Sequence, residues 1–498
     1  MDWFVWAIVL AGFWLRFHLA GESYLNSDET QIMTPPFEHG LVAVYKAGLV
    51  FPYGPFNNFL LYFMTFFGGS EQYFRMIAVV PGALMAFVGY RWAAYLFGPA
   101  TGVATACILS FSPSMVNISA EVRHYMMHTF LLVCAMYCLE RAFGEQSLKW
   151  MRLFGASLLL ALLTMYMSIW ATAAIGVYAL LRILHRELPR RLVLEWLMIQ
   201  MAALLICAAA YATHLYKLRG SGAEAFARDG WLRGSYYHPE SQHLSNFLIT
   251  STKALFVYLF GNSPLGIWMI YVFAAGIVLI LWARGRRLSV LSFVLPVMAT
   301  CAAAILGLYP FGGSRHDAFL IAFVAVPVAV AISFVAGRKV IVVLLAAMIL
   351  APYWQSAGQM NYLEVEPKFR KLEQMSSALH YLANITPRPK VLLVDEEGAE
   401  LVKYYVCHAK MEEVGGPTPD LRIYSCGDYK VLLVKQWSVD ASILAGVLEG
   451  ARPMAPNEFP DPVWVFSVSD RTRITGNKVG ENAGQFGRLL VTRVSPPN

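Results

Sequence analysis

The chain opens with the apolar stretch WFVWAIVLAGFWLRFHLA at residues 3–20, and the acidic pair Asp28-Glu29 follows after a short polar segment. Such a stretch is close to the roughly 20 residues that a helix needs to cross a bilayer. Carboxylates are costly to desolvate at a membrane surface, so a pair held at the exit of a span is a candidate functional site. We therefore expect the chemistry of this protein near Asp28-Glu29, at the lipid–water boundary.

The composition is that of a membrane protein. Of the 498 residues, 57% are hydrophobic and only 14% are charged, whereas soluble proteins carry about 25% charged residues. The net charge of +7 is modest, and basic residues in membrane proteins mostly set orientation. Because no compact Lys/Arg run with interleaved aromatic residues is present, we expect no nucleic-acid partner.

Hydrophobic segments of spanning length recur along the first two thirds of the chain. They predict a polytopic α-helical membrane protein with about eleven transmembrane helices. No basic region precedes the first segment and no convincing cleavage site lies near Ala20, which favours a retained span over a removed signal peptide. The expected spans are roughly residues 3–20, 74–97, 100–117, 124–142, 150–166, 168–184, 195–213, 264–283, 288–308, 317–336 and 339–354.

The distribution of Lys and Arg predicts the orientation of these spans. Basic residues cluster in alternate loops, and the side that carries them is normally cytoplasmic. We therefore predict a multi-pass protein of the inner (plasma) membrane with a cytoplasmic N-terminus, so that Asp28-Glu29 faces outward. The segments predicted on the extracytoplasmic face are 21–73, 118–123, 214–263, 309–316 and 355–498.

Two of these outer loops, 21–73 and 214–263, contain apolar runs that are too short to cross. These runs, Phe56–Phe67 and Phe247–Phe260, predict helices that lie at the membrane interface. Such helices either border a cleft through which a lipid enters or merely cap the helix bundle.

A change of composition near Gln355 divides the chain into a transmembrane domain, 1–354, and a small extracytoplasmic α/β domain, 355–498. Cys407 and Cys426 in the second domain either form a disulfide, if the domain is extracytoplasmic, or remain free thiols. Gly415-Gly416-Pro417 predicts a turn. Apolar runs predict strands at 390–395, 430–434, 463–466 and 489–491, and helices are expected at 366–383 and 437–449.

The acidic pair has two chemical uses. One carboxylate can act as a general base on an acceptor hydroxyl, or the pair can ligate a divalent cation. The alternative is a solvated loop, because Asp-Glu pairs are common. The position beside the first span, next to Tyr24 and Asn26, favours the functional interpretation.

Two arginines on the predicted outer face run against the usual charge bias. Arg123 lies in the short turn Glu121–Tyr125 together with His124, and Arg315-His316 lies in the turn Tyr309–Asp317. A guanidinium matches phosphate oxygens, and histidine can bind an anion or hold a proton near neutrality. The alternatives are a salt bridge from Arg123 to Glu121 or to lipid headgroups, and a tight turn with an exposed basic residue.

These features together resemble the C-type (GT-C) membrane glycosyltransferases, in particular the bacterial group similar to protein O-mannosyltransferases and aminoarabinose transferases. The likeness covers about residues 1–350, and the domain at 355–498 matches no family that we can name. His316 departs from the tyrosine that is more usual there. The resemblance is carried by Ser27-Asp28-Glu29, by Tyr53–Tyr62 running into Gly69–Arg75, by Ser112-Pro113-Ser114 with Ser119–Tyr125, and by Ser314-Arg315-His316.

The resemblance implies an enzyme of the cell envelope that takes a hexosyl or pentosyl group from a polyprenyl-phosphate-linked donor in the membrane. The sugar is transferred on the outer face to a lipid, glycan or protein acceptor, with inversion at the anomeric carbon by direct displacement. Asp28 is then the catalytic residue with Glu29 beside it, and Arg123 and Arg315 bind the phosphate. His124, Tyr125, His316 and Tyr53 are further candidates for substrate binding. No cofactor is implied with certainty; a divalent cation held by Asp28 and Glu29 is the one alternative.

Two other classes of function fit some of these features. A lipid or polysaccharide transporter also carries carboxylates and arginines on its substrate pathway, but the mid-span regions here are nearly free of charge and no repeat is visible. A membrane scaffold would use residues 355–498 to recruit a partner.

Overall fold

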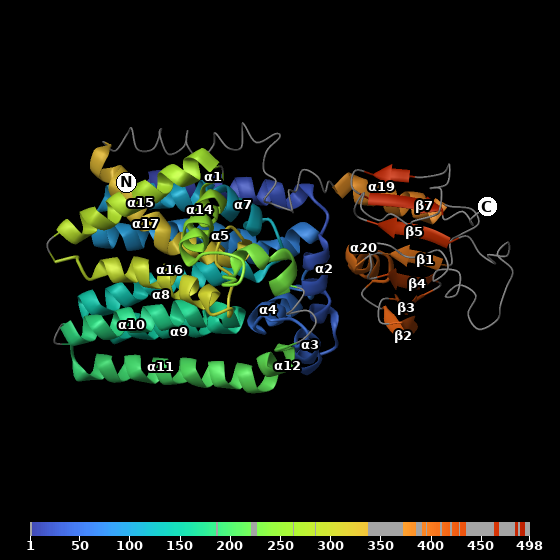
Figure 1. The fold of residues 1–498 in the computed structure, drawn as a ribbon, viewed down its shortest axis with the longest axis horizontal. Helices are drawn as coiled ribbons and strands as arrows, with labels where there is room; N and C mark the ends of the chain where they lie inside the picture. The colour runs from blue at the N-terminus through green and yellow to red at the C-terminus, as the bar shows by residue number, and fades with distance from the viewer. Residues whose placement is uncertain are drawn as a thin grey trace. The chain divides into compact units, whose positions relative to one another are not determined.

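The computed structural model describes residues 2–185, 188–220, 227–261, 263–283, 285–336, 372–384, 391–394, 396–408, 411–418, 421–427, 429–434, 463–467, 484–486 and 489–493. They form two compact units, coloured by residue number in Figure 1. The membrane unit contains the described residues up to Ala20 and from Gly40 to Ala336. The sheet unit contains Gly21–His39 and the described residues from Leu372 onward.

The membrane unit is a bundle of α-helices, which confirms the expected fold class. It begins with α1 (Asp2–Glu22), whose last two residues belong to the sheet unit. The other helices are α3 (Leu41–Gly48), α4 (Phe56–Met64), α5 (Glu71–Phe97), α6 (Pro99–Phe111), α7 (Pro113–Ser119), α8 (His124–Glu145), α9 (Leu148–Thr164), α10 (Ile169–His185), α11 (Arg190–Ala210), α12 (Tyr216–Leu218), α14 (Leu244–Phe260), α15 (Ser263–Trp282), α16 (Ser289–Ile305) and α17 (Ile321–Val335).

Each expected span within the described residues coincides with a helix, and the last, 339–354, lies outside them. In the described part of the chain, seven helical segments are long and apolar enough to cross a membrane, or eight if α6 and α7 form one broken span. Helices α9, α14 and α16 are slightly shorter than these segments, with 17 residues each. The predicted short turn between α9 and α10 is the 3₁₀ turn η2 (Tyr166–Ser168).

The expected single span at 100–117 is wrong in one respect, because it is broken. Helices α6 and α7 meet at Ser112 with a bend of 54°. Pro113 has no N–H to continue the hydrogen bonds of α6, but it fits the first turn of a new helix. The break redirects the chain toward the turn that carries Arg123.

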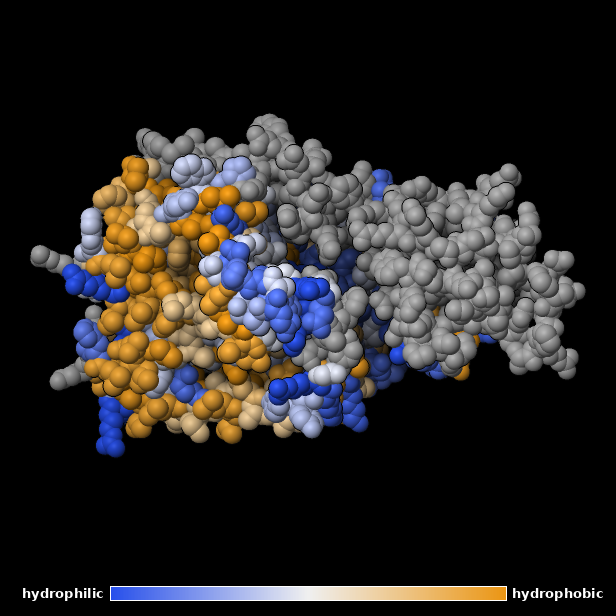
Figure 2. Space-filling model, in the orientation of Figure 1, coloured by the Kyte–Doolittle hydropathy of each residue, from blue (hydrophilic) through white to orange (hydrophobic). Residues whose placement is uncertain are grey.

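The surface and the packing of the membrane unit are those of a lipid-embedded bundle. Large apolar side chains are exposed, including Trp14 (63%), Leu205 (66%) and Trp268 (66%), and Figure 2 shows the apolar surface on the face in view. Inside, a Cβ on Gly276 of α15 would lie 1.9 Å from the carbonyl oxygen of Pro327 in α17. Glycine therefore allows the close backbone approach that membrane helices use for packing.

Arg16 of α1 is a fully buried cation that holds the broken span in place. Its Nη1 donates to the carbonyl oxygen of Ser110 (2.6 Å) and its Nη2 to that of Leu109 (2.8 Å), both in the last turn of α6. Its Nε donates to Ser119 Oγ at the end of α7 (3.0 Å). Because the last carbonyls of a helix lack intrahelical donors, Arg16 supplies hydrogen-bond donors that the break removes.

We expect Arg16→Met to destabilise the membrane unit by about 2–5 kcal/mol, because two buried carbonyls and a hydroxyl lose their donor. The matched control is Arg152→Met, since Arg152 is 69% exposed and pairs with Glu195 at the surface; we expect it to cost less than about 1 kcal/mol. Thermal unfolding in detergent measures both. Equal melting temperatures for the two variants would show that Arg16 does not stabilise the break.

The sheet unit contains a seven-stranded mixed sheet with the order β2-β3-β4-β1-β5-β7-β6. The central strand β1 (Val391–Val394) pairs in parallel with β4 (Tyr429–Val434) and β5 (Val463–Ser467). Antiparallel pairs add β3 (Leu421–Cys426) and β2 (Glu412–Thr418) on one side, and β7 (Leu489–Arg493) and β6 (Gly484–Phe486) on the other. The four predicted strands correspond to β1, β4, β5 and β7.

The predicted turn at Gly415-Gly416-Pro417 is wrong, because these residues lie within β2. Strand β2 is at the edge of the sheet, and its register against β3 shifts at Gly415. Edge strands tolerate proline and bulges, since one side of the strand needs no ladder hydrogen bonds. The predicted helix at 366–383 is α19 (Leu372–Asn384) in its described part, and the one at 437–449 lies outside the described residues.

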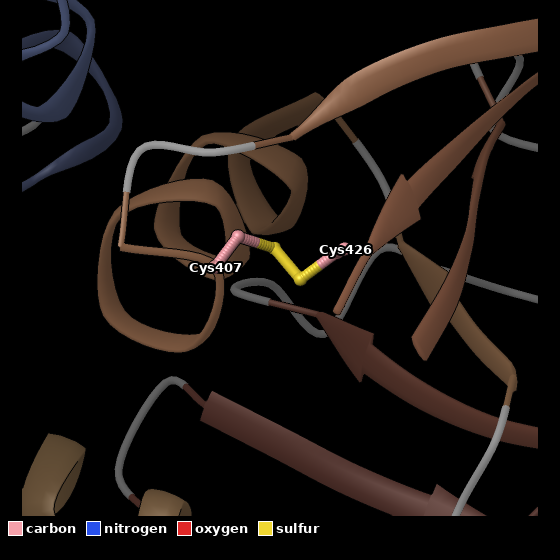
Figure 3. The surroundings of a disulfide bond; sticks show 2 residues. All are labelled: Cys407 and Cys426. Atoms are coloured by element: carbon pink, nitrogen blue, oxygen red, sulfur yellow. A yellow bond between two sulfur atoms is a disulfide. The ribbon is translucent and has the colours of Figure 1, made fainter. Parts of the chain in front are cut away.

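Cys407 and Cys426 form a disulfide, drawn in Figure 3. Cys407 follows η8 (Val402–Val406), and Cys426 ends β3, so the bond ties the helical layer to the sheet. This decides between the two alternatives that the sequence left open.

The segment after the first span belongs to the sheet unit because it packs into that unit's core. Tyr24 is fully buried in a cluster with Leu392, Val394 and Leu382. The N–H of Leu25 donates to the hydroxyl of Tyr405 (2.9 Å). Helix α2 (Ser27–Met33) then packs against α20 (Glu396–Leu401).

Candidate functional site

Arg123 is held at the start of α8. It occupies the N-cap position with extended backbone angles, and its N–H donates to the carbonyl of Glu121 (2.8 Å). The guanidinium lies over the ring of Tyr125, 5.3 Å from the centroid, and its Nη2 donates to the Tyr125 hydroxyl (3.3 Å). Arg123, His124 and Tyr125 are all buried. A long helix carries partial positive charge at its N-terminus, which reinforces the charge of Arg123.

The second arginine turn is built around Asp317. Its fully buried Oδ2 accepts from the N–H of Gly312 (2.9 Å) and from Ser314 Oγ (3.2 Å). Tyr309 donates its hydroxyl to the carbonyl of His316 (2.7 Å). The pKa of Tyr309 is raised well above its usual value, mainly by burial and secondly by the negative charge of Asp317, so its hydroxyl remains a donor. These bonds fix the backbone that presents Arg315 and His316, both partly exposed.

The structure brings the two arginine turns together. The 3₁₀ segment η6 (Arg315–Leu320) packs against α8. The rings of Tyr125 and His316 meet edge to face with centroids 5.6 Å apart. His124 lies within the electrostatic range of both Arg123 and Arg315. The structure therefore brings together two arginine-bearing turns that are separated by almost 200 positions in the sequence.

Tyr53 joins this cluster from the first loop. Its ring stacks on that of His124 with centroids 5.0 Å apart. Burial raises the pKa of Tyr53 above its ordinary value, although the nearby Arg123 acts in the opposite direction. Tyr53 is therefore a neutral phenol that can donate a hydrogen bond inside the site. Together, Tyr53, Arg123, His124, Tyr125, Arg315 and His316 form what we call the arginine cluster.

The two members of the acidic pair occupy different environments in the sheet unit. Glu29 is fully buried; its Oε2 accepts from the N–H of Asn26 (2.9 Å), and its own N–H donates to Asn26 Oδ1 (2.8 Å). This reciprocal capping box closes the N-terminus of α2. Asp28 is partly exposed in the same first turn. The carboxylate of Glu29 is thus used in local structure, and Asp28 is the more exposed member of the pair.

A metal site receives no further support. Within the described ranges, no group of three or more His, Cys, Asp or Glu side chains is arranged to hold a metal ion. Cys134 and Cys138, one helical turn apart in α8, are free thiols.

Two residues near the arginine cluster were not among the candidates from the sequence. Tyr258 of α14 is close enough to Arg315 and Glu121 for electrostatic interaction, and it belongs to the apolar run Phe247–Phe260, which predicted only an interfacial helix. Asp317 was visible only as the end of a turn. Its carboxylate directly follows a Gly-Gly-Ser-Arg-His turn and precedes an apolar span. This was a usable signal, because an ionisable residue at the end of a span is costly to desolvate and is therefore a candidate functional residue.

Comparison with protein families gives one match. Residues 54–215 match the family described as dolichyl-phosphate-mannose-protein mannosyltransferase. This range runs from the loop after Tyr53 to the end of η3 (Tyr211–Leu215) and contains Arg123 but not Arg315. A comparison with curated protein sequences gives no significant match.

Solved structures extend the likeness over the whole chain. ArnT from Cupriavidus metallidurans bound to undecaprenyl phosphate superposes with a TM-score of 0.54 at 12% identity, over 98% of this chain and 98% of that one. Its apo state gives the same TM-score of 0.54 at 12% identity, over 99% and 98%. The fold is that of the GT-C membrane glycosyltransferases. This confirms the resemblance that the sequence motifs carried.

At lower similarity, the chain also superposes on the oligosaccharyltransferase AglB from Archaeoglobus fulgidus, in complex with an inhibitory peptide and a dolichol-phosphate. Its TM-score is 0.46 at 12% identity over 81% of this chain, which spans 63% of AglB. At this TM-score the likeness adds nothing to the fold assignment.

Proposed function

We propose that this protein is a glycosyltransferase that takes a sugar from a polyprenyl-phosphate donor in the membrane and transfers it to an acceptor on the extracytoplasmic face. The observation that carries the proposal is the arginine cluster, because the turn with Arg315 packs against the N-terminal part of the chain segment that holds Arg123 and Tyr125. The family match, and the undecaprenyl phosphate bound to a protein of the same fold, support it.

The proposed reaction is a direct displacement with inversion. An acceptor hydroxyl attacks the anomeric carbon of the sugar, and the bond from this carbon to the phosphate oxygen breaks. The lipid phosphate leaves with the bonding electrons, while the base takes the proton of the acceptor hydroxyl. Negative charge grows on the leaving phosphate, so stabilisation by preorganised cations is the largest contribution that the protein can make.

Each candidate residue has a role in this scheme. Arg123 and Arg315 bind the phosphate, and the hydroxyls of Tyr53 and Tyr125 are donors beside it. His124 and His316 line the same site. Asp28 is our candidate for the base, because the Glu29 carboxylate is engaged in the capping box of α2.

The disulfide supports the predicted orientation. Disulfides persist in oxidising compartments, so Cys407–Cys426 favours an extracytoplasmic sheet unit. This agrees with the side that the Lys/Arg distribution predicts, and together they favour an inner-membrane protein with its acceptor site outside.

The phosphate-binding part of the proposal is tested by ligand-induced stabilisation of the purified protein. Undecaprenyl phosphate at about 100 times its dissociation constant raises the free energy of unfolding by about 2.7 kcal/mol. We expect this stabilisation from undecaprenyl phosphate and not from undecaprenol, which has the same chain without the charge. We also expect its loss in the double variant Arg123→Gln/Arg315→Gln. Equal stabilisation by the alcohol, or by the double variant, would contradict the proposal.

A further inference from the structure

Helix α4 turns polar residues inward and apolar residues outward. Its buried positions are Asn57 (0% exposed), Asn58 (2%) and Leu61, one face of the helix. Its other side chains are apolar or aromatic and reach the surface, with Phe63 exposed by 49%. The outward side is suited to lipid, but an interfacial helix usually buries apolar residues where it meets its own protein. The burial of the two asparagine side chains therefore calls for an explanation within the protein.

The asparagine side chains are buried at a cost that the described residues do not offset. Neither Nδ2 nor Oδ1 of Asn57, nor Oδ1 of Asn58, has a hydrogen-bond partner among the residues that the structure describes. Burying an amide without a partner costs about 1–3 kcal/mol, and native proteins leave few such groups. Buried polar atoms that stability does not explain indicate groups kept for a ligand.

Tyr53 connects these asparagines to the arginine cluster. It lies just before α4, and its ring stacks on His124. Its buried hydroxyl lies near the side chain of Asn58 and within range of Arg123, although no hydrogen bond of good geometry satisfies it. Arg123 and Asn58, which follows Asn57 on the buried face of α4, thus lie near the same phenol.

We propose that Asn57 and Asn58 bind hydroxyl groups of the sugar of the lipid-linked donor. The inference rests on the proposed function and adds the sugar-recognition part of the site. A carboxamide both donates and accepts, as sugar hydroxyls do, whereas a phosphate accepts and is matched by the arginines. The neutral face predicts a donor sugar recognised through its free hydroxyls rather than through a charged substituent.

The test compares lipid binding by the wild type and Asn57→Leu in the full-length protein. The probes are undecaprenyl phosphate and undecaprenyl phosphates that carry mannose, glucose, galactose or arabinose. We expect the wild type to bind one sugar-linked lipid about tenfold more tightly than the bare lipid, as one or two net hydrogen bonds allow. Asn57→Leu should lose this preference and keep its affinity for the bare lipid.

The melting temperature separates recognition from structure. Because leucine has no polar atoms to leave unsatisfied, Asn57→Leu should unfold at the wild-type temperature or above. Asn57→Ala serves if leucine does not fit. The matched control, Asn246→Leu, changes an exposed asparagine of α14 and should alter neither quantity.

Three results would overturn the inference and leave the proposed function standing. These are equal binding of bare and sugar-linked lipids by the wild type, a wild-type preference retained in the variant, and unfolding of both Asn57 variants. A wild type that binds none of the lipids would instead overturn the proposed function.

Discussion

Replacing Arg123 by glutamine should lower the proposed rate of sugar transfer by about 10²–10³-fold, the usual effect of losing one preorganised group that stabilises developing negative charge. The residue is buried at the N-cap of α8, so its charge acts in a weakly screened environment. Arg123→Lys keeps the charge but not the planar fork, and we expect it to lose about tenfold. The measurement is the initial rate with a polyprenyl-phosphate sugar.

The control for this prediction is Arg152→Gln. Arg152 is 69% exposed near the start of α9, beside the C-terminal end of α8, so the same charge is removed from the same polypeptide away from the arginine cluster. Its transfer rate should stay within about twofold of the wild type. Equal losses in Arg123→Gln and Arg152→Gln would point to a nonspecific effect of net charge and contradict the phosphate role.

Asp28→Asn should lower the rate of sugar transfer by about 10²–10⁴-fold, because an amide cannot accept the proton of the acceptor hydroxyl. The matched variant is Glu29→Gln, one position along the same turn. Glutamine can also serve in a capping box, so this change keeps the local structure and removes only the charge. We expect Glu29→Gln to retain most of the wild-type rate.

The pair of variants assigns the acting carboxylate. The rate of Asp28→Asn should stay low at every pH, because asparagine has no carboxylate that can regain its charge. Stabilisation by undecaprenyl phosphate is the folding control, since a misfolded variant would lose it as well. Undiminished transfer by Asp28→Asn would remove Asp28 from the mechanism. Loss in Glu29→Gln alone would assign the base to Glu29.

The membrane helices could be predicted from the sequence because hydrophobic length is a strong local signal. The break at Ser112-Pro113 was missed, since a proline inside an apolar segment often only kinks a helix. The role of Arg16 depends on that break: its acceptors, in the last turn of α6 and at the end of α7, lie about 100 positions away. Hydrogen bonds between residues so far apart in the sequence leave no trace in the hydrophobic periodicity from which helices are predicted.

Some residues of the arginine cluster were likewise identified as candidates from the sequence. Arg123 and Arg315 stood out because they oppose the charge bias of their predicted loops, and the structure packs the two turns that carry them together. The local role of Glu29 followed from Asn26 three positions earlier, a capping pattern that we overlooked. The inward asparagines of α4 were hidden in the motif Tyr53–Tyr62, because sequence alone does not say which side of an interfacial helix faces the protein.

The most direct test of the central claim is sugar transfer from a lipid-phosphate donor. Membranes containing the protein are supplied with polyprenyl phosphates that carry radiolabelled sugars, and label is followed into the lipid, glycan and protein fractions. We predict transfer from one such donor by the wild type, loss of transfer in Arg123→Gln, and no direct use of nucleotide sugars. Movement of the intact donor across the membrane without cleavage of its sugar–phosphate bond would identify a transporter and contradict the account.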